Sequence, residues 1–424
     1  LSPVPSPTPT PSAAAAWTST PQPVVPTIAA TVVITSGVGL PDWTTPVPTV
    51  AVPADILQVL LLGSDGSRYV KDQNTDVMIV AVVNRTTKQV SMLSIPRDLW
   101  VYIPTFGWGR INTAHRIGHR KDYPGQGPAL LMRTIEHNLG IPIDHWVRVD
   151  LQGFTRAVDE LGGVEMTVAC PINLRYRPPT SDQEEEMWLL PGVYHMDGAT
   201  ALRYVRTRRG GDDFQRAPRQ QQFLRAVWDQ VKGPGLIARI PGLWSALKDT
   251  VHTDLGLGEI VSLAPLALEV RPERVRSRYI GLGQVLGWTT KAGARVQLPL
   301  HDRIQAQVAS LYAAPSAQKD SAAGEAARIQ VLNGTQRPQL ALIAADQLRW
   351  QGLNVVGTGP AQEREHLQTE IIVYEESPQT LAALLRLLKL EPENILHQPP
   401  AGHEVPGNQV DILIILGEDY DPCR

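Results

Sequence analysis

The chain has 424 residues with a formal net charge of −3, and 43% of them are hydrophobic, which predicts two or three folded units with sizeable cores. The isoelectric point near 6.4, with basic residues dispersed apart from one cluster, excludes a general nucleic-acid-binding surface. No run of about 20 apolar residues is present, so the printed chain is not expected to span a membrane.

The N-terminus and the cysteines give two further expectations. The chain does not begin with Met and has no Lys or Arg before Arg68, so a signal-peptide n-region is absent and we expect a mature or truncated form. Cys170 and Cys423 are too few for a disulfide framework, and we expect two unpaired thiols rather than a bond between them.

Composition divides the chain into segments. Residues 1–53 hold 12 of the 36 prolines among Thr, Ser and Ala, which predicts an extended linker or, alternatively, a disordered tail without a spacing role. A second linker is predicted at 313–327, where Ala, Ser and Gly dominate. The chain would then comprise a large unit at 54–312, a small unit at 328–418 and a short tail at 419–424.

The large unit begins with three segments that predict buried strands. Residues 56–65, 75–84 and 89–98 are rich in Val, Ile and Leu, and the polar residues between the second and third predict a hairpin turn. Helical spacing of apolar residues follows at 127–140 and 151–163, and both patterns end in Gly, as helices often do. The sequence therefore predicts a sheet covered by helices.

The small unit alternates between the two kinds of pattern. Strands are predicted at 328–335, 369–375 and 409–417, with helices at 338–352 and 379–390, which indicates a compact α/β domain. It has no recognisable acid–base or metal cluster. We therefore expect it to be dispensable for chemistry and to serve placement or partner binding.

Charged residues lie at the ends of the first three predicted strands. If these strands run alternately up and down, Asp65, Asp76 and Arg97 fall at the same edge of the sheet. Two carboxylates suit Mg²⁺, which is commonly held by one or two carboxylates and by substrate phosphate oxygens. The alternative is that these aspartates only form turns, their usual role at strand ends.

Seven arginines and no lysine occur in "RYVRTRRGGDDFQRAPRQQQFLR", residues 203–225. We predict that Arg206 and Arg208, two apart, share one face of a strand that ends at the following glycines. A helix is then predicted to begin near Pro218, a residue favoured in a first turn.

The start of this predicted helix suits an anion. Arg216, Arg219 and Gln220 would lie near its N-terminus, where free N–H groups and the helix dipole attract negative charge. Arg grips oxygens in a bidentate, planar manner that Lys does not reproduce. The pattern predicts a phosphate or pyrophosphate site; a solvated helix with surface salt bridges is the alternative.

Taken together, these motifs resemble the LytR-CpsA-Psr family. The resemblance is carried by "LLLGSD", "SMLSIPRDLWVYIP", "GRINTAH" and "GATALRYVRTRRGGDDFQRAPRQQQFL", in that order. In the small unit, "IQVLNGT" and "DILIILG" resemble the LytR C-terminal domain. The resemblance implies an α/β/α sandwich around a central mixed sheet, followed by a small α/β domain.

The resemblance also implies an activity and a location. Such enzymes are phosphotransferases that attach polyprenyl-pyrophosphate-linked glycopolymers to peptidoglycan during cell-wall assembly. The expected partners are the lipid-linked glycan, the peptidoglycan acceptor and the membrane surface, with no nucleic acid. Contact with the membrane is expected through the lipid carrier and through an N-terminal anchor that is typical of the family and missing from the printed chain. The expected location is extracytoplasmic and associated with a bacterial cell membrane.

Residue roles follow from matching positions. Asp65 and Asp76 would hold Mg²⁺ or Mn²⁺, and Asp213 would activate the acceptor hydroxyl, with Arg97 and Arg216 as its catalytic partners. The residues implied to bind the pyrophosphate substrate are Arg97, Arg110, Arg206, Arg208, Arg216, Arg219 and Gln220. This chain departs from the family pattern at Trp100, where Tyr is common, and at His115, where an aromatic residue is common.

The lipid carrier would also need an apolar channel beside the charged site. We expect helices around 128–147 and 220–232 to line it, although the same apolar residues could form ordinary core. Two other functions remain open at this stage: hydrolysis of the polyprenyl pyrophosphate by water, and binding of an anionic wall polymer without catalysis.

Overall fold

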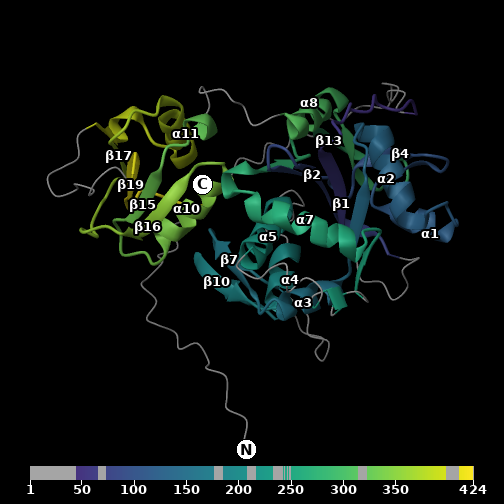
Figure 1. Ribbon diagram of the computed structural model, residues 1–424, viewed down its shortest axis with the longest axis horizontal. Coiled ribbons are helices and arrows are strands. Elements are labelled where there is room, and N and C mark those ends of the chain that lie inside the picture. The colour runs from purple at the N-terminus through teal and green to yellow at the C-terminus, as the bar shows by residue number, and fades with distance from the viewer. Residues whose placement is uncertain are drawn as a thin grey trace, which may run out of the picture.

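The computed structural model shows two units connected side by side, the large one containing β1 and β2 and the small one containing β15 and β19 (Figure 1). The residues that it describes are 44–64, 73–175, 185–207, 216–232, 242, 244, 245, 247, 250–313, 322–397 and 410–423. None of the helices within these ranges is both long enough and apolar enough to cross a membrane.

A six-stranded mixed sheet forms the centre of the large unit, in the order β11-β6-β1-β2-β3-β12. Strand β2 pairs antiparallel with both β1 and β3, which confirms the predicted up-and-down arrangement. Strands β6 and β12 add parallel partners to β1 and β3, respectively. The strands span β1 (Ile56–Ser64), β2 (Thr75–Asn84), β3 (Gln89–Ser94), β6 (His145–Val149), β11 (Val251–Thr253) and β12 (Val275–Tyr279).

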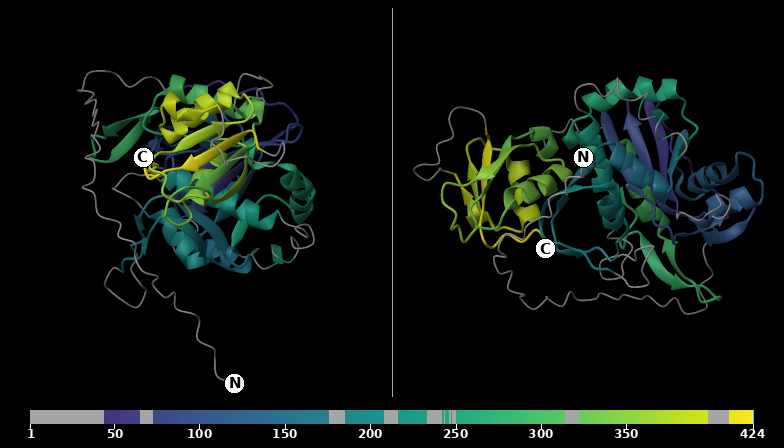
Figure 2. Two further views of the ribbon diagram at one scale, coloured as in Figure 1. Left: turned by 90° about the vertical axis from the view of Figure 1, so that its left-hand side faces the viewer. Right: turned by 90° about the horizontal axis from the view of Figure 1, so that it is seen from below.

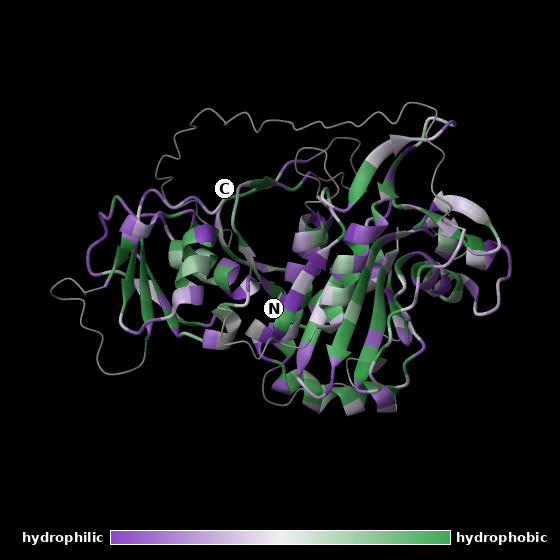
Figure 3. Cartoon of the chain, turned by 90° about the horizontal axis from the view of Figure 1, so that it is seen from above, coloured by the Kyte–Doolittle hydropathy of each residue, from purple (hydrophilic) through white to green (hydrophobic). Residues whose placement is uncertain are grey.

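Both faces of this sheet are apolar, as the hydropathy colouring of its strands shows (Figure 3). Successive side chains of a strand point to opposite faces. Leu60 therefore faces one helical layer, while Leu61 faces the other. The near-continuous runs of Val, Ile and Leu are the sequence counterpart of a sheet buried on both sides.

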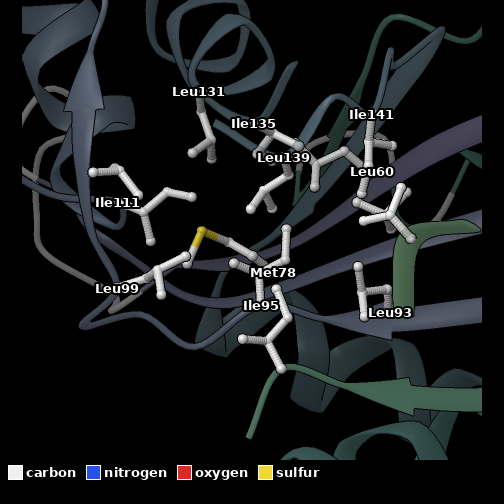
Figure 4. Packing of buried hydrophobic residues seen from close by; sticks show 14 of the residues in the cluster. Leu60, Met78, Leu93, Ile95, Leu99, Ile111, Leu131, Ile135, Leu139 and Ile141 are labelled. Carbon is white, nitrogen blue, oxygen red and sulfur yellow. The ribbon is translucent and has the colours of Figure 1, made fainter. Parts of the chain in front are cut away.

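The first face holds the main core (Figure 4). Leu60, Met78 and Leu93 from the sheet pack with Leu131 and Ile135 from α2, and all five are almost fully buried. Burying one such side chain stabilises the fold by roughly 1.5–3 kcal/mol. This layer consists of α1 (Thr113–Arg120), α2 (Gln126–Leu139) and α8 (His301–Tyr312).

The second face is covered by α3 (Leu151–Glu160), α4 (Gly198–Arg206) and α5 (Arg216–Val231). Two of these helices have aspartate N-caps: Asp150 accepts from Gly153 N at 2.7 Å, and Asp197 accepts from Thr200 N at 2.8 Å. Two helical layers around a mixed sheet make the predicted α/β/α sandwich, which is confirmed (Figure 2).

Helix α4 corrects one prediction. The spacing of Arg206 and Arg208 suggested a strand, but Arg206 is the last residue of a helix that the Asp197 cap begins, and Arg208 lies outside the described residues. Ala and Leu in "GATALRYVR" favour a helix, and this local propensity together with the cap overrides a short alternating pattern.

Short elements complete the large unit. Among the described residues, four antiparallel ribbons pair β4 with β5, β7 with β10, β8 with β9, and β13 with β14. The bounds are β4 (Trp100–Ile103), β5 (Gly107–Arg110), β7 (Val164–Val168), β8 (Ile172–Asn173), β9 (Trp188–Leu189), β10 (Gly192–Met196), α7 (Leu257–Glu269), η3 (Pro272–Arg274), β13 (Val285–Thr289) and β14 (Arg295–Pro299).

The small unit is an α/β domain with its own core, as predicted. Its five-stranded sheet has the order β16-β15-β19-β17-β18, of which β16 and β18 were not predicted. The bounds are α9 (Ala322–Glu325), β15 (Ile329–Asn333), α10 (Leu340–Trp350), β16 (Val355–Pro360), β17 (Glu370–Val373), α11 (Pro378–Leu388), η4 (Pro392–Asn394), β18 (Ile395–Leu396) and β19 (Ile412–Leu416).

A disulfide connects the two units and contradicts the expectation of free thiols. Cys170 lies just after β7, and Cys423 lies near the end of the chain, with their Cα atoms 5.2 Å apart. This separation is typical of disulfides. The two cysteines are 253 positions apart in sequence, so only the packing of the small unit against the large one brings them together.

The buried His115 of α1 predicts that the stability of the fold is sensitive to acid. Burial, together with the neighbouring His119 and Arg148, lowers the pKa of His115 to about 4, although the hydrogen bond of its Nδ1 to the carbonyl of Gln73 opposes this shift. Unfolded His115 takes up a proton near its ordinary value of about 6.5. The contribution of neutral His115 to the free energy of unfolding is therefore fully present above about pH 6.5. It is lost as the pH drops towards 4, which lowers the free energy of unfolding by about 3 kcal/mol.

We expect the melting temperature of the wild-type protein to fall between about pH 7 and pH 4.5, and the fall to be smaller in His115→Gln. Thermal unfolding of both proteins across this range measures the difference. An identical acid dependence in the two proteins would contradict the assignment to His115.

Candidate functional site

The edge of the sheet brings Asp76 and Arg97 together. Ile79 pairs with Ser94 in the antiparallel ladder of β2 and β3, and the same register continued by three residues puts Arg97 opposite Asp76. Arg97 Nη1 donates to Asp76 Oδ1 at 2.9 Å, and both side chains are partly buried. The predicted meeting of these two residues is confirmed.

Asp98 extends this ion pair and was missed by the sequence analysis. One of its oxygens lies 3.5 Å from Arg97 Nε, and the other lies 3.1 Å from Arg110 Nε. Arg110, at the end of β5, also donates to the carbonyl of Arg295 at 2.9 Å. The signal was present in "PRD", where an acid adjoins the arginine that was selected.

The first turn of α5 lies across this edge. Arg216 is the first residue of the helix and is only 8% exposed, and Gln220 follows one turn later. Both line a small cavity of about 30 Å³ together with Asp76 and Arg97. Two guanidinium groups and a helix N-terminus thus converge on one point, an arrangement that favours an anion.

A larger apolar cavity of about 280 Å³ opens from the same place, between the sheet and α3, α4 and α5. Its charged and amide lining consists of Asp76, Asp150, Arg206, Arg216 and Gln220. Its apolar lining includes Leu61, Val77, Ile79, Val147, Phe154, Ala157, Leu161, Leu202, Phe223, Leu224 and Val227. The volume is near the lower end of the range of small-molecule pockets, about 300 Å³.

This cavity tests the expected channel. The segment 220–232 does line it, through Phe223, Leu224 and Val227. The expectation for 128–147 is wrong except for Val147, because α2 packs into the core on the opposite face of the sheet. An amphipathic pattern shows that a helix has an apolar face but does not show which side of the sheet it covers.

The remaining predicted side chains are placed differently. Arg206 is exposed at the end of α4 and lines the apolar cavity. Arg219 lies away from the cavity that Asp76 and Arg97 line. Its guanidinium donates to the carbonyl of Tyr204 at 2.8 Å and also to that of Thr207, and so satisfies the C-terminal end of α4.

Asp65, Arg208 and Asp213 lie outside the described residues. Within the described ranges, no three or more His, Cys, Asp or Glu side chains are grouped to hold a metal ion. The predicted metal site is thus described at Asp76 only. Its carboxylate is a hard oxygen donor beside the cavity of about 30 Å³, a setting that suits Mg²⁺ when substrate phosphates supply further ligands.

The geometry as a whole suits an amphiphilic anion. The polar groups would bind its charged head, and the apolar cavity would bind its tail. The same arginines would also stabilise negative charge that develops during a reaction at the head.

Comparisons with known proteins agree with these features. The family model described as the LytR_cpsA_psr family matches residues 44–308, and one described as the LytR cell envelope-related transcriptional attenuator matches residues 326–420. The crystal structure of TagV from Bacillus subtilis has the same fold, with a TM-score of 0.51 and 24% identity over 62% of this chain and 98% of that one.

Two curated relatives are named polyisoprenyl-teichoic acid–peptidoglycan teichoic acid transferases. The chain is 31% identical to TagT of Bacillus subtilis over 51% of this chain and 66% of TagT. It is 31% identical to TagU of Oceanobacillus iheyensis over 49% of this chain and 62% of TagU. The matched region thus spans less than two thirds of either relative. The LytR_cpsA_psr family model covers more than half of this chain. The chain therefore belongs to the LytR-CpsA-Psr family, as its motifs predicted.

Proposed function

We propose that this protein is a phosphotransferase that moves a glycopolymer from a polyprenyl pyrophosphate carrier to peptidoglycan. The observation that carries the proposal is the apolar cavity of about 280 Å³ that opens beside Asp76, Arg206 and Arg216. A lipid pyrophosphate combines the two chemistries that this site offers. The names of the relatives TagT and TagU support the same reaction.

The transfer would proceed by displacement at phosphorus. The acceptor hydroxyl attacks the phosphorus bonded to the glycan, the bridging P–O bond breaks, and polyprenyl phosphate leaves. Negative charge grows on the leaving phosphate during this step. Arg97 and Arg216 would stabilise that charge, because positioned cations act on charge that develops in the transition state.

The other predicted residues would take supporting roles. Arg206, Arg208 and Gln220 would bind the pyrophosphate, and Arg110 would act beside Arg97 through their shared partner Asp98. Asp213 would accept the proton of the acceptor hydroxyl.

A metal ion would complete the site. Asp76 and Asp65 would hold Mg²⁺ or Mn²⁺, which would neutralise pyrophosphate charge when bound. Because the acceptor is peptidoglycan, the enzyme would work outside the cytoplasmic membrane, at the surface that holds its lipid carrier.

The first prediction tests the reaction itself. With a lipid pyrophosphate glycan and a peptidoglycan acceptor, the wild-type protein should release polyprenyl phosphate and form the glycan–acceptor product, both dependent on a divalent ion. Asp76→Ala should abolish this activity because it removes a metal ligand, while circular dichroism stays unchanged. Release without acceptor would instead indicate hydrolysis, and binding without release would indicate a non-catalytic module; either result contradicts the proposal.

The second prediction concerns arginine chemistry. Arg97→Lys and Arg216→Lys keep the charge but lose the paired, planar hydrogen bonds. Each should lower the transfer rate at least about tenfold, or about 1.4 kcal/mol of transition-state stabilisation. Arg133→Lys, on the exposed surface of α2, is the matched control and should be neutral. Equal rates in all three variants would show that charge alone suffices.

The third prediction concerns the apolar cavity. Ala157→Phe introduces a ring where Ala157 lines the cavity from α3, so it should weaken binding of octaprenyl pyrophosphate about tenfold. Inorganic pyrophosphate has no lipid tail, so its affinity for the same variant should not change. Calorimetry with both ligands makes the comparison. Equal affinity of the variant and the wild-type protein for octaprenyl pyrophosphate would exclude this cavity as the lipid site.

A further inference from the structure

Two faces of helix α5 each line a cavity, and only one of these cavities belongs to the site described above. The first face points into the apolar cavity with Arg216, Gln220, Phe223, Leu224 and Val227. The second lines a cavity of about 410 Å³ beside the small unit with Gln222, Arg225, Ala226, Asp229 and Gln230. Both sets repeat every three or four positions, so each is a continuous stripe along the helix.

Helix α10 of the small unit lies against the second face of α5 (Figure 1). Gln222 Nε2 donates to Asp346 Oδ2 at 3.2 Å, and the guanidinium of Arg225 lies 4.6 Å from the centre of the Trp350 ring. Arg225 is only 7% exposed, and burial lowers its pKa while Asp346 opposes that shift. The small unit therefore supplies both an aromatic face and an opposite charge to this buried cation.

Gln222 is the junction between the small unit and the helices of the site. Its Nε2 also donates to the carbonyl of Thr167 on β7 at 2.8 Å. Its Oε1 accepts from Tyr204 Oη on α4 at 3.2 Å. An amide offers two N–H groups and one carbonyl oxygen. Gln222 uses both N–H groups and its oxygen here, and so joins α5 to α4, β7 and α10.

The same contacts reach the arginines of the site. Tyr204 is two residues before Arg206, and its carbonyl accepts from Arg219 of α5 at 2.8 Å. Arg216 is less than two turns before Gln222 on the same helix. A shift of α10 would thus bear on both helices that carry the pyrophosphate-binding arginines.

The C-terminal end of the chain holds α10 in place. Gln347 of α10 donates to the carbonyl of Pro422 at 2.9 Å, and Tyr420 Oη donates to Gln347 Oε1 at 2.5 Å. The adjacent Cys423 is bonded to Cys170, which follows β7. The position of α10 is therefore fixed from two sides.

We propose that the small unit positions the pyrophosphate-binding arginines, with Asp346 and Gln222 as the positioning residues. The proposal rests on the proposed function, because it concerns the same lipid pyrophosphate site. On this proposal the small unit is needed for activity, in contrast to the expectation from the sequence that it is dispensable for chemistry. The small unit supplies no reacting group. It holds in place α4 and α5, the two helices that carry the arginines of the site.

The test uses three variants of the full chain and octaprenyl pyrophosphate as the ligand. Asp346→Leu removes the acceptor for Gln222 and should weaken binding about tenfold, within the range of ordinary coupling between sites. Asp346→Asn keeps the acceptor oxygen for Gln222 and loses only the charge opposite Arg225, so its loss of affinity should be clearly smaller than that of Asp346→Leu. Glu376→Leu removes a carboxylate on the exposed surface of the small unit and is the matched control.

Hydrogen exchange of residues 216–231 provides a second readout that needs no ligand. Exchange should quicken most in Asp346→Leu, clearly less in Asp346→Asn, and should not change in Glu376→Leu. Wild-type affinity together with wild-type exchange in Asp346→Leu would overturn the proposal, as would equal losses in the Leu and Asn variants. If Asp346→Leu does not fold, Gln222→Met, which keeps the length but not the hydrogen bonds, decides by the same criteria.

These outcomes separate the two proposals. A wild-type protein that binds octaprenyl pyrophosphate but transfers no glycan would refute the transferase function, while the binding and exchange data would still decide whether the small unit positions the arginines. A transferase whose Asp346→Leu variant keeps full affinity and full exchange protection would refute only the positioning role.

Discussion

The ion pair between Arg97 and Asp76 depends on the register between β2 and β3, and the rest of the site is arranged around it. That register is fixed because both faces of the strands are buried. A slip by one residue would turn Met78 and Leu93 away from the core, at a cost of several kcal/mol. The core thus sets the position of the charged groups that lie beyond the ends of the strands.

The two faces of the sheet are used differently. On one face, α2 fills the space with Leu131, Ile135 and Leu139, and these side chains are fully buried. On the other, α3, α4 and α5 leave an apolar cavity that ends at Asp76 and Arg216. Charged groups are tolerated next to apolar surface here because each is paired or lies at the cavity end. Arg97, for example, is paired with both Asp76 and Asp98.

The features that could be predicted from the sequence are those set by local patterns. The hairpin of β2 and β3 followed from the short polar segment between them, and the meeting of Asp76 with Arg97 followed from the assumption that the first three strands alternate in direction. Long-range packing gave the errors. Only packing decides that α2 covers the face opposite the cavity, or that Cys423 reaches Cys170. At Arg206, a local pattern misled because Asp197, nine residues earlier, begins a helix.

Helix α5 connects all parts of the molecule because each part uses a different stripe of it. Gln221 is fully buried and donates to Ser94 Oγ at 2.8 Å and to the carbonyl of Arg278 at 3.0 Å, which fixes the helix to the ends of β3 and β12. Its neighbour Gln220 lines the cavity, and its other neighbour Gln222 contacts the small unit. Successive residues of a helix point about 100° apart, so three adjacent glutamines can serve three surfaces. The three glutamines begin four residues after Arg216, which opens the helix, so the side chains that fix the helix in place lie within two turns of the arginine at the end of the cavity.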